Sequence, residues 1–181
     1  MTQPYPVWTG EGWIEVDVPQ MDGEGLVVPN VAAVVYDASR TRVLLQRRDK
    51  PGEVVRGRIE VPGGRWGAGE AAATAVAREV LEETGVTVVE MISEGTRHEH
   101  SPAMAIEATH PAAVVVGLNG AYPALLVVYE CIGVGSPQPQ AGETADPAWW
   151  QIDDVRSHLA NDPEDFVWQA ATVLRTVLAS G

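Results

Sequence analysis

Hydrophobic and polar positions follow two different periods along this chain, and the two periods alternate. Short apolar runs rich in β-branched residues predict buried strands, whereas apolar positions three and four residues apart predict an amphipathic helix. The expected strands are residues 13–18, 31–36, 42–48, 59–61, 86–92, 112–116, 124–132 and 149–152. The expected helices are residues 70–84, 155–160 and 163–179. This order of elements predicts an α/β fold in which a mixed sheet carries helices on both faces.

The helix expected at residues 70–84 has two distinct sides. Its apolar stripe is formed by Ala73, Ala77, Val80, Leu81 and Thr84. Glu79, Glu82 and Glu83 are spaced i, i+3 and i+4, so they share one side of the helix. We expect that side to lie opposite the stripe, and we expect Gly85 to end the helix.

The chain divides into an extension and one domain. Residues 1–29 contain scattered Pro, Gly and Trp residues, and the strand expected within them could pack on the domain or on a partner. Residues 30–181 form the domain, because no linker or internal repeat argues for a second one.

Residues 93–111 lack an apolar period and predict a long, mobile surface loop over the site. The loop contains His98, Glu99 and His100, with His110 further on, and these residues raise the question of a second metal site. A fourth ligand at a zinc-type spacing is missing, so a mobile loop that covers the substrate is the favoured interpretation.

Composition and charge narrow the function. The 181 residues suit one domain with a full core, and the formal net charge of -13 argues against a general nucleic-acid binder, because such a field repels polyanions. No apolar run approaches the roughly 20 residues that span a bilayer, and residues 1–6 lack the basic and apolar regions of a signal peptide. Cys131 is the only cysteine, so we expect no internal disulfide, a buried thiol and a cytoplasmic location.

The three clustered carboxylates of the first helix point to metal chemistry. Like charges on one helical face repel, and a purely structural helix has little use for them. Hard divalent cations such as Mg²⁺ and Mn²⁺ seek carboxylate oxygens and remove that repulsion. The glycines at 63 and 64, just before the helix, allow the backbone to come close to a bound ion.

The same stretch resembles the Nudix box of the Nudix hydrolase family. The pattern is Gly, five residues, Glu, seven residues, Arg-Glu, an aliphatic residue, one residue, Glu-Glu, one residue, Gly and an aliphatic residue. The matching residues are Gly64, Glu70, Arg78, Glu79, Val80, Glu82, Glu83, Gly85 and Val86. The resemblance implies an α/β/α sandwich with a mixed sheet and a loop-helix-loop catalytic motif. It also implies Mg²⁺- or Mn²⁺-dependent hydrolysis of a nucleoside diphosphate linked to another group, by water attack at phosphorus.

The resemblance also implies roles for residues of the box. The metal ligands would be the carboxylates of Glu79, Glu82 and Glu83, together with the carbonyl oxygen of Gly64. Arg78 precedes Glu82 by four residues, so we expect it to hold that carboxylate in a bidentate pair.

Glu70 falls near the start of the helix, and we expect it to serve as a cap and dipole partner rather than as a ligand. A general base must take a proton from the attacking water. Glu82 and Glu83 are candidates for it. Glu143 is a third, because its segment, with the Trp149-Trp150 pair, resembles the one that closes the site in many family members.

Substrate signals outside the box are weaker. Pro102 follows the box by 16 residues and Glu60 precedes it, a spacing that resembles ADP-ribose pyrophosphatases. The favoured substrate is therefore ADP-ribose or a nucleotide sugar, and the alternative is a nucleoside triphosphate.

Cationic and aromatic side chains add candidate substrate contacts. Arg47 and Arg48 are adjacent in a strand, so at most one reaches a phosphate, and we take Arg47 as the candidate. Trp66 or Trp149 could stack on a base, whereas Trp168 is expected to pack in the core.

Two further classes fit the box less well. A non-catalytic ligand sensor with the same fold tends to lose box carboxylates, and this chain keeps them. Isopentenyl diphosphate isomerase shares the fold but needs a cysteine ahead of the box, and Cys131 lies after it. The expected partner is thus a small nucleoside diphosphate derivative, with no nucleic-acid polymer and no membrane, and a homodimer stays open.

Overall fold

The computed structural model describes residues 3–8, 12–18, 27–93, 95–101, 104–117 and 124–179. The main sheet has eight strands: β3 (Val28–Tyr36), β4 (Arg42–Arg48), β5 (Ile59–Glu60), β6 (Gly63–Arg65), β7 (Thr87–Met91), β10 (Ala113–Val116), β11 (Ala124–Val134) and β12 (Thr144–Gln151). Its helices are α1 (Ala72–Thr84), α2 (Ile152–Asn161) and α3 (Trp168–Leu178), with a short 3-10 helix at Pro163–Asp165.

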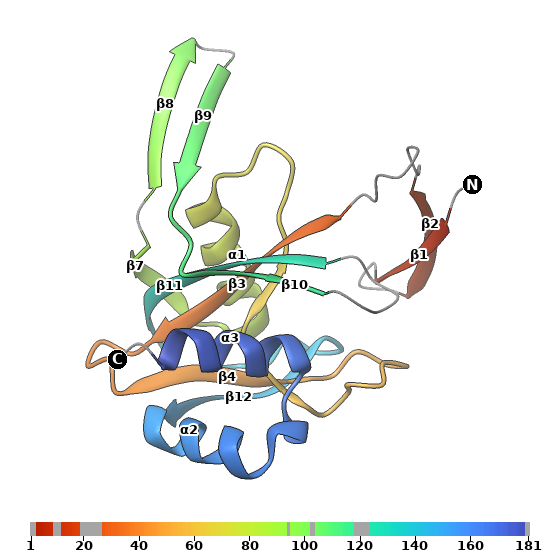
Figure 1. Ribbon diagram of the computed structural model, residues 1–181, viewed down its shortest axis with the longest axis vertical. Helices are drawn as coiled ribbons and strands as arrows, with labels where there is room; N and C mark the ends of the chain where they lie inside the picture. Colours follow the sequence, from red (N-terminus) through yellow and green to blue (C-terminus); the bar gives the residue numbers. More distant parts are fainter. Residues whose placement is uncertain are drawn as a thin grey trace.

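The sheet is mixed, as the sequence predicts. Its main path runs β10-β11-β3-β4-β12, so β10 and β12 form its two edges. β11 and β3 are parallel, and the other pairings are antiparallel. In Figure 1, α1 covers one face of the sheet, and α2 and α3 cover the other. The α/β/α sandwich is therefore confirmed.

Side-chain alternation along the strands separates two cores. In β4, Leu44 packs in the cluster under α1, while Val43 and Leu45 pack in the cluster under α2 and α3. β3 repeats this pattern, because its alternate residues also join different clusters. Neighbouring residues of one strand thus face different chemical surroundings.

The turn between β3 and β4 is organised by Asp37. Its carboxylate accepts hydrogen bonds from the backbone N–H groups of Thr41 and Arg42 and from the side chains of Ser39 and Arg42. The side chain is only 11% exposed. Burial raises the pKa of Asp37, but these hydrogen bonds outweigh burial and hold the pKa at about 2.

The orientation of α1 differs from the expected one. The buried residues of this helix are Ala72, Ala75, Val76, Glu79, Val80, Glu83 and Thr84. Ala73 and Leu81, expected in the stripe, are exposed, and Leu81 is 51% exposed. The helix is rotated so that two of its carboxylates point toward the sheet. The prediction that all three lie opposite the apolar stripe was wrong, because Gln46 and the Gly63 N–H give Glu83 polar partners in the sheet and Gly64 leaves space for Glu79. Gly85 does end the helix, in a left-handed conformation with φ of 68°.

The segment expected to be a loop at 93–111 is a β-hairpin. β8 (Gly95–Ser101) pairs with β9 (Met104–Thr109), and the hairpin projects away from the main sheet (Figure 1). The sequence signal is weak because the described hairpin residues are largely exposed and no buried face imposes an apolar alternation. A second hairpin joins β1 (Gln3–Trp8) to β2 (Trp13–Val18), the latter at the predicted strand.

The last predicted helix is also shorter than expected. Residues 163–165 form the 3-10 turn, Phe166 is completely buried beside Ile59, and the helix begins at Trp168. Burial of Phe166 against the sheet interrupts the helical path. Trp168, expected in the core, is 58% exposed and lies under the Arg58 guanidinium.

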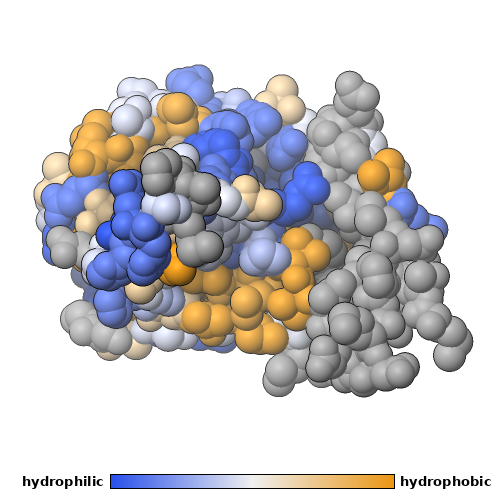
Figure 2. All heavy atoms as spheres, turned by 90° about the horizontal axis from the view of Figure 1, so that it is seen from above, coloured by the Kyte–Doolittle hydropathy of each residue, from blue (hydrophilic) through white to orange (hydrophobic). Residues whose placement is uncertain are grey.

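The surface carries both charged and apolar areas. Figure 2 shows hydrophobic residues gathered in one area next to strongly hydrophilic ones. On the edge strand β10, Val114 and Val116 are about half exposed. Cys131 is buried, as predicted, and burial raises the pKa of its thiol to about 12. None of the described helices is long and apolar enough to span a bilayer.

Candidate active site

The glycine-rich segment before α1 brings the backbone against two of the helix carboxylates. The Gly63 N–H donates a hydrogen bond of 2.9 Å to Oε2 of Glu83. A Cβ atom on Gly64 would collide with the Glu79 carboxylate, lying 2.6 Å from its Cδ atom. Only a residue without a side chain leaves Glu79 this space, which explains why a glycine stands at position 64.

Arg78 contacts three carboxylates of the box, but its bidentate partner is Glu70. The Nε and Nη2 atoms of Arg78 donate to Glu70 at 2.9 and 3.0 Å. Its Nη1 atom contacts Glu79 at 2.6 Å and Glu82 at 3.3 Å. The expected bidentate pair with Glu82 was therefore wrong.

Glu70 is structural, although it is not the cap that the sequence predicts. The residue before α1 is Ala71, which makes no side-chain cap. Glu70 instead accepts a hydrogen bond from the Gly67 N–H, and the hydrogen bonds from Arg78 lower its pKa. It ties the loop before α1 to the second turn of the helix.

The N-terminus of α1 donates a hydrogen bond to the β8–β9 hairpin. The Ala72 N–H donates to Oε2 of Glu107 at 2.8 Å. Two residues on, Thr109 accepts a hydrogen bond of 2.9 Å from Tyr129, whose ring meets Trp66 edge to face. The hairpin thus contacts the start of α1 directly and is linked to Trp66 through Tyr129.

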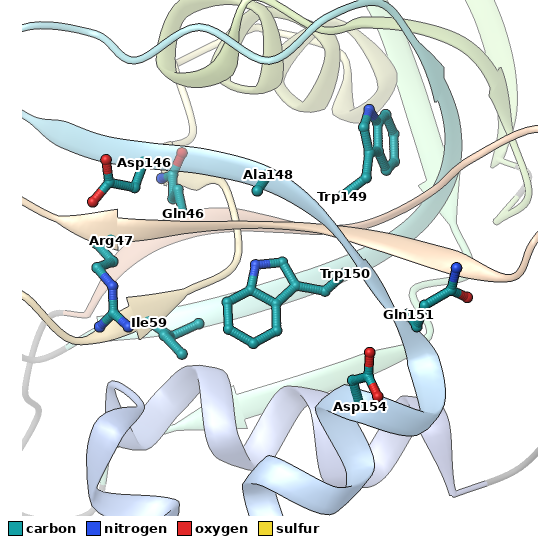
Figure 3. A pocket seen from close by; sticks show the side chains of 9 residues that line it. All are labelled: Gln46, Arg47, Ile59, Asp146, Ala148, Trp149, Trp150, Gln151 and Asp154. Atoms are coloured by element: carbon teal, nitrogen blue, oxygen red, sulfur yellow. The ribbon is translucent and has the colours of Figure 1, made fainter.

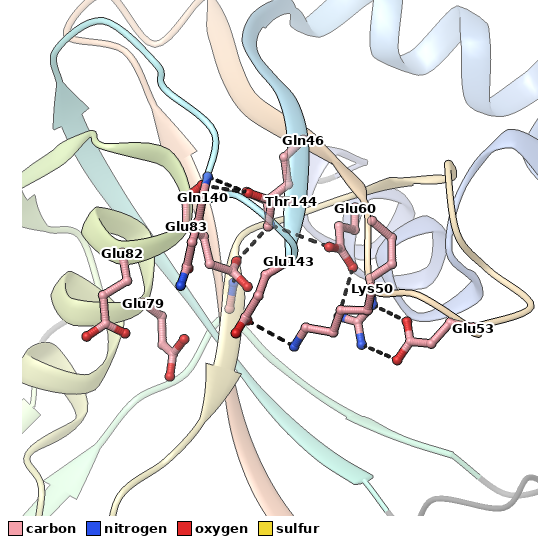
Figure 4. A network of polar contacts seen from close by, with 12 residues as sticks. Gln46, Lys50, Glu53, Glu60, Glu79, Glu82, Glu83, Gln140, Glu143 and Thr144 are labelled. Carbon is pink, nitrogen blue, oxygen red and sulfur yellow. Dashed lines mark hydrogen bonds and ion pairs between the residues drawn. The ribbon is translucent and has the colours of Figure 1, made fainter. Parts of the chain in front are cut away.

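Glu83 and Glu60 form a buried acidic pair beside Gln46. Glu83 is 4% exposed and accepts a hydrogen bond of 2.7 Å from Gln46, which lies 3.5 Å from Glu60 (Figure 4). Arg48 lies 3.5 Å from Glu60 and makes its closer ion pair with Glu53. Burial raises the pKa of both Glu60 and Glu83, and the repulsion of Glu60 raises that of Glu83 further.

Glu143, the loop candidate for the general base, lies close to Lys50 and to the C-terminal end of α1. Its carboxylate is 3.2 Å from Nζ of Lys50 (Figure 4). The next residue, Thr144, donates a hydrogen bond of 2.9 Å to the carbonyl oxygen of Glu83 and accepts one from the Gln140 N–H. This contact fixes the segment of Glu143 against the end of α1.

The donor set suits a hard divalent cation, although it is not gathered into a finished cluster. Among the described residues, no three His, Cys, Asp or Glu side chains are placed together as a metal site. Glu79 is turned toward Arg78 and Glu83 toward Gln46, and burial raises the pKa of Glu79 as well. Carboxylates whose charged forms are disfavoured by burial gain most from a divalent cation.

Arg47 lies on the far side of the sheet from these carboxylates. It donates to Asp165 at 3.1 and 3.3 Å and to the carbonyl oxygen of Gly57 at 2.6 Å. Its neighbour Arg48 is the arginine that reaches the acidic pair. Only one of the two arginines faces the site, as expected, but it is Arg48 and not Arg47.

The two candidate stacking residues are partly buried in the cluster under α1. The Trp66 Nε1–H donates to the Glu70 carbonyl oxygen at 2.8 Å, and that of Trp149 to the Gly135 carbonyl oxygen at 3.3 Å. Pro102 lies outside the described residues.

A cavity of about 410 Å³ runs along the edge strand β12. It is lined by Gln46, Arg47, Ile59, Asp146, Ala148, Trp149, Trp150, Gln151 and Asp154 (Figure 3). Trp149 and Trp150 point to opposite sides of the strand. Gln46 lines this cavity and also donates to Glu83, which places the cavity next to the acidic pair.

Sequence reasoning missed Lys50, Gln46 and Glu107. Gln46 could have been found from strand alternation, because it is the polar residue between Leu44 and Arg48 on one face of β4. Lys50 and Glu107 carry no such signal, since lysine and glutamate are most often found on protein surfaces.

Comparison with known proteins agrees with this arrangement. A model of the NUDIX domain matches residues 27–174. No curated protein sequence matches the chain significantly.

Solved structures share the fold at low sequence identity. The MutT protein from Methanosarcina mazei Go1 has a TM-score of 0.62 and 19% identity, with 85% of this chain and 94% of that chain covered. The MutT NUDIX hydrolase from Burkholderia pseudomallei has a TM-score of 0.56 and 18% identity, with coverages of 84% and 99%. The NUDIX domain of Shewanella oneidensis NrtR, crystallised with ADP ribose, has a TM-score of 0.60 and 15% identity, with coverages of 90% and 93%.

The family match covers most of the chain, and within it Gly64 admits Glu79, and Glu83 is buried on the inner side of α1. Family members generally use divalent metal ions. The chain therefore belongs to the NUDIX domain family and is a Nudix-type pyrophosphohydrolase.

Proposed function

We propose that this enzyme hydrolyses ADP-ribose or a related nucleoside diphosphate sugar into two monophosphates, by attack of water at phosphorus. The observation that carries the proposal is the inward-facing carboxylate group of α1, with Glu83 buried and Glu79 seated against Gly64. A group of this kind serves a diphosphate better than a neutral ligand, since bound cations would turn a repulsive site into an attractive one.

The proposed metal is Mg²⁺ or Mn²⁺, held by Glu79, Glu82, Glu83 and the Gly64 carbonyl oxygen. Such an ion would neutralise the diphosphate and lower the pKa of a bound water. Arg78 and Glu70 hold the start of the helix and steer Glu79 and Glu82. Excess chelator should abolish turnover, and Mg²⁺ or Mn²⁺ should raise the melting temperature by mass action. Equal turnover with and without chelator would contradict the metal assignment.

Glu143 is the general base that we favour over Glu82 and Glu83. Glu83 already accepts two hydrogen bonds and is almost completely buried. The Glu82 side chain is 52% exposed and close to Arg78. Glu143 is 22% exposed, and Thr144 anchors its segment to α1. We expect Glu143→Gln to lower turnover by about 10²-fold, the lower part of the range for general base catalysis, without loss of metal-induced stabilisation.

The substrate assignment rests on the spacing of Glu60 and Pro102 and on one structural neighbour, the NrtR domain that binds ADP ribose. A phosphate-release screen over ADP-ribose, nucleotide sugars and nucleoside triphosphates tests it. Water labelled with heavy oxygen should end in one monophosphate. Turnover confined to triphosphates would support the alternative, a nucleoside triphosphate pyrophosphohydrolase. Binding without turnover of any of these compounds would instead support a ligand sensor.

The cytoplasmic location stays a prediction, and a homodimer stays an open alternative. Fractionation of cells would test the first, and light scattering of the purified chain would test the second.

A further inference from the structure

Lys50 is a largely buried cation at the entrance to the carboxylate group. It lies in the segment after β4, and its side chain is only 15% exposed. Its ammonium meets the Glu143 carboxylate at 3.2 Å (Figure 4). Its positive charge favours the ionised forms of Glu60 and Glu79, and so opposes the burial that raises the pKa of both. Fixing a lysine side chain costs conformational entropy, and an ion pair at the surface contributes too little stability to offset that cost.

The two arginines closest to these carboxylates already use their donors in ion pairs with glutamates. Arg48 is clamped on Glu53 through Nε and Nη2, and its Nη1 faces Glu60. Arg78 uses Nε and Nη2 for Glu70 and Nη1 for Glu79 and Glu82. Their guanidinium donors are thus committed to the framework of the site.

The ammonium of Lys50 differs in this respect. It has three N–H donors and a flexible stem, so it can move between acceptors at little geometric cost. Its partner, Glu143, lies in a turn and is itself partly exposed. A diphosphate that enters the proposed site approaches the carboxylates of α1 and of Glu143, which repel it. A cation on a flexible stem beside Glu143 is placed to compensate for that repulsion.

We propose that Lys50 binds a phosphate oxygen of the substrate, and that it gives up Glu143 to do so. The assignment rests on the proposed function, because it requires a diphosphate in this site. Lys50 would be a substrate-binding residue, and the exchange would leave the Glu143 carboxylate open to the attacking water at the moment when substrate is bound.

The test measures binding of methylene diphosphonate, a non-hydrolysable diphosphate without a nucleoside, by calorimetry in the presence of Mg²⁺. The variants are Lys50→Met, Lys50→Arg and the matched control Arg56→Met. Arg56 lies in the same segment and pairs with Asp49, but its side chain is 54% exposed. Lys50→Met should weaken binding about tenfold, the loss of one charge-assisted hydrogen bond. Lys50→Arg should restore most of the affinity, and Arg56→Met should bind as the unmodified chain does.

Glu143→Gln tests the exchange separately and does not depend on the folding of Lys50→Met. Removing the competing carboxylate should tighten methylene diphosphonate binding, even though turnover falls. Unchanged affinity in Lys50→Met with a lowered melting temperature would reduce Lys50 to a structural ion pair and overturn the proposal. Unchanged or weaker binding in Glu143→Gln would overturn the exchange.

The result is separable from the substrate assignment. If ADP-ribose is not hydrolysed but Lys50→Met loses the diphosphonate, the substrate proposal fails and the role of Lys50 stands. If ADP-ribose is hydrolysed and Lys50→Met binds the diphosphonate normally, the substrate proposal stands and the role of Lys50 fails.

Discussion

Arg47 and Arg48 are neighbours in β4, yet the charged groups around Arg47 are paired, whereas acidic groups are in excess around Arg48. Arg47 faces α2 and α3, where Asp165 accepts two of its hydrogen bonds and His158 also lies 3.0 Å from Asp165. Hydrogen bonds from Arg47 lower the pKa of Asp165. Arg47 and Asp165 therefore pair with groups of opposite sign.

Arg48 faces α1, where acidic groups outnumber basic ones. It is shared between Glu53 and Glu60, and beyond Glu60 lies the buried Glu83. Burial raises the pKa of Glu60 and Glu83 instead of lowering it. A balanced ion cluster can be explained by stability alone. An unbalanced one that survives beside it indicates a site that is completed by a ligand.

The largest effect on turnover should come from a substitution among the acidic groups under α1. Glu83→Gln retains an oxygen that can accept from Gln46 and from the Gly63 N–H, while it removes a ligand charge. We expect turnover to fall by about 10²-fold or more, on the scale of losing a key electrostatic stabiliser. Because the buried charge is unfavourable without metal, the metal-free variant should be at least as stable as the original chain.

Thermal unfolding with and without Mg²⁺, together with turnover, checks this prediction. Glu90→Gln is the control, since Glu90 is exposed and pairs with Arg40 away from the site. Near-normal turnover in Glu83→Gln would remove Glu83 from the metal ligands.

Asp37, whose carboxylate is fully hydrogen-bonded, should stabilise the folded chain in its charged form, in contrast to Glu83. The pKa of Asp37 in the folded chain is about 2, below its ordinary value of 3.8. Its contribution to stability is therefore complete above pH 4 and is lost as the pH falls toward 2. Asp37→Asn should be less stable than the original chain by about 2 kcal/mol at pH 5, and the two should converge near pH 2.

Urea unfolding across this pH range measures the difference. Asp153→Asn, at a side chain that is 93% exposed, should show no such convergence. A stability gap between Asp37→Asn and the original chain that does not change with pH would show that the carboxylate charge is irrelevant to the turn.

The balanced side of the sheet should respond in stability and not in catalysis. Asp165→Asn removes the charge that Arg47 and His158 share, and we expect a loss of about 1.5 kcal/mol, as for hydrogen bonds to charged groups. Turnover of the folded enzyme should stay unchanged. Glu164→Gln, at an adjacent exposed residue, is the control. A strong loss of turnover at full folding would place Arg47 in the substrate site after all.

The smallest effect concerns the tie between the hairpin and α1. Glu107→Ala leaves the Ala72 N–H without its carboxylate, and we expect a loss of about 0.5–1 kcal/mol in unfolding free energy, as for a missing helix cap. Glu107→Gln should recover part of it. Glu99→Ala, on the paired strand, should be neutral because Glu99 is exposed. If Glu99→Ala costs as much as Glu107→Ala, the effect belongs to the hairpin and not to the cap.

Local pattern was sufficient for much of this molecule. The strand 42–48, the strand 13–18, the end of α1 at Gly85 and the residues of the box follow from apolar period, turn chemistry and spacing, all of which act within a few residues. The burial of Cys131 also follows from its apolar run. These features depend on neighbours along the chain, and so the amino-acid sequence determined them by itself.

Long-range contacts decided the rest. The rotation of α1, which buries Glu79 and Glu83 and exposes Leu81, depends on Gln46 and on the backbone of β6, neither of which is near in sequence. The pairing of Arg78 with Glu70 depends on the path of the loop before α1, and the position of Lys50 depends on Glu143, which lies far along the chain. A helical period identifies which residues share a side, but only the packing against the sheet determines which side is buried, because the energy of burying a carboxylate is set by its partners.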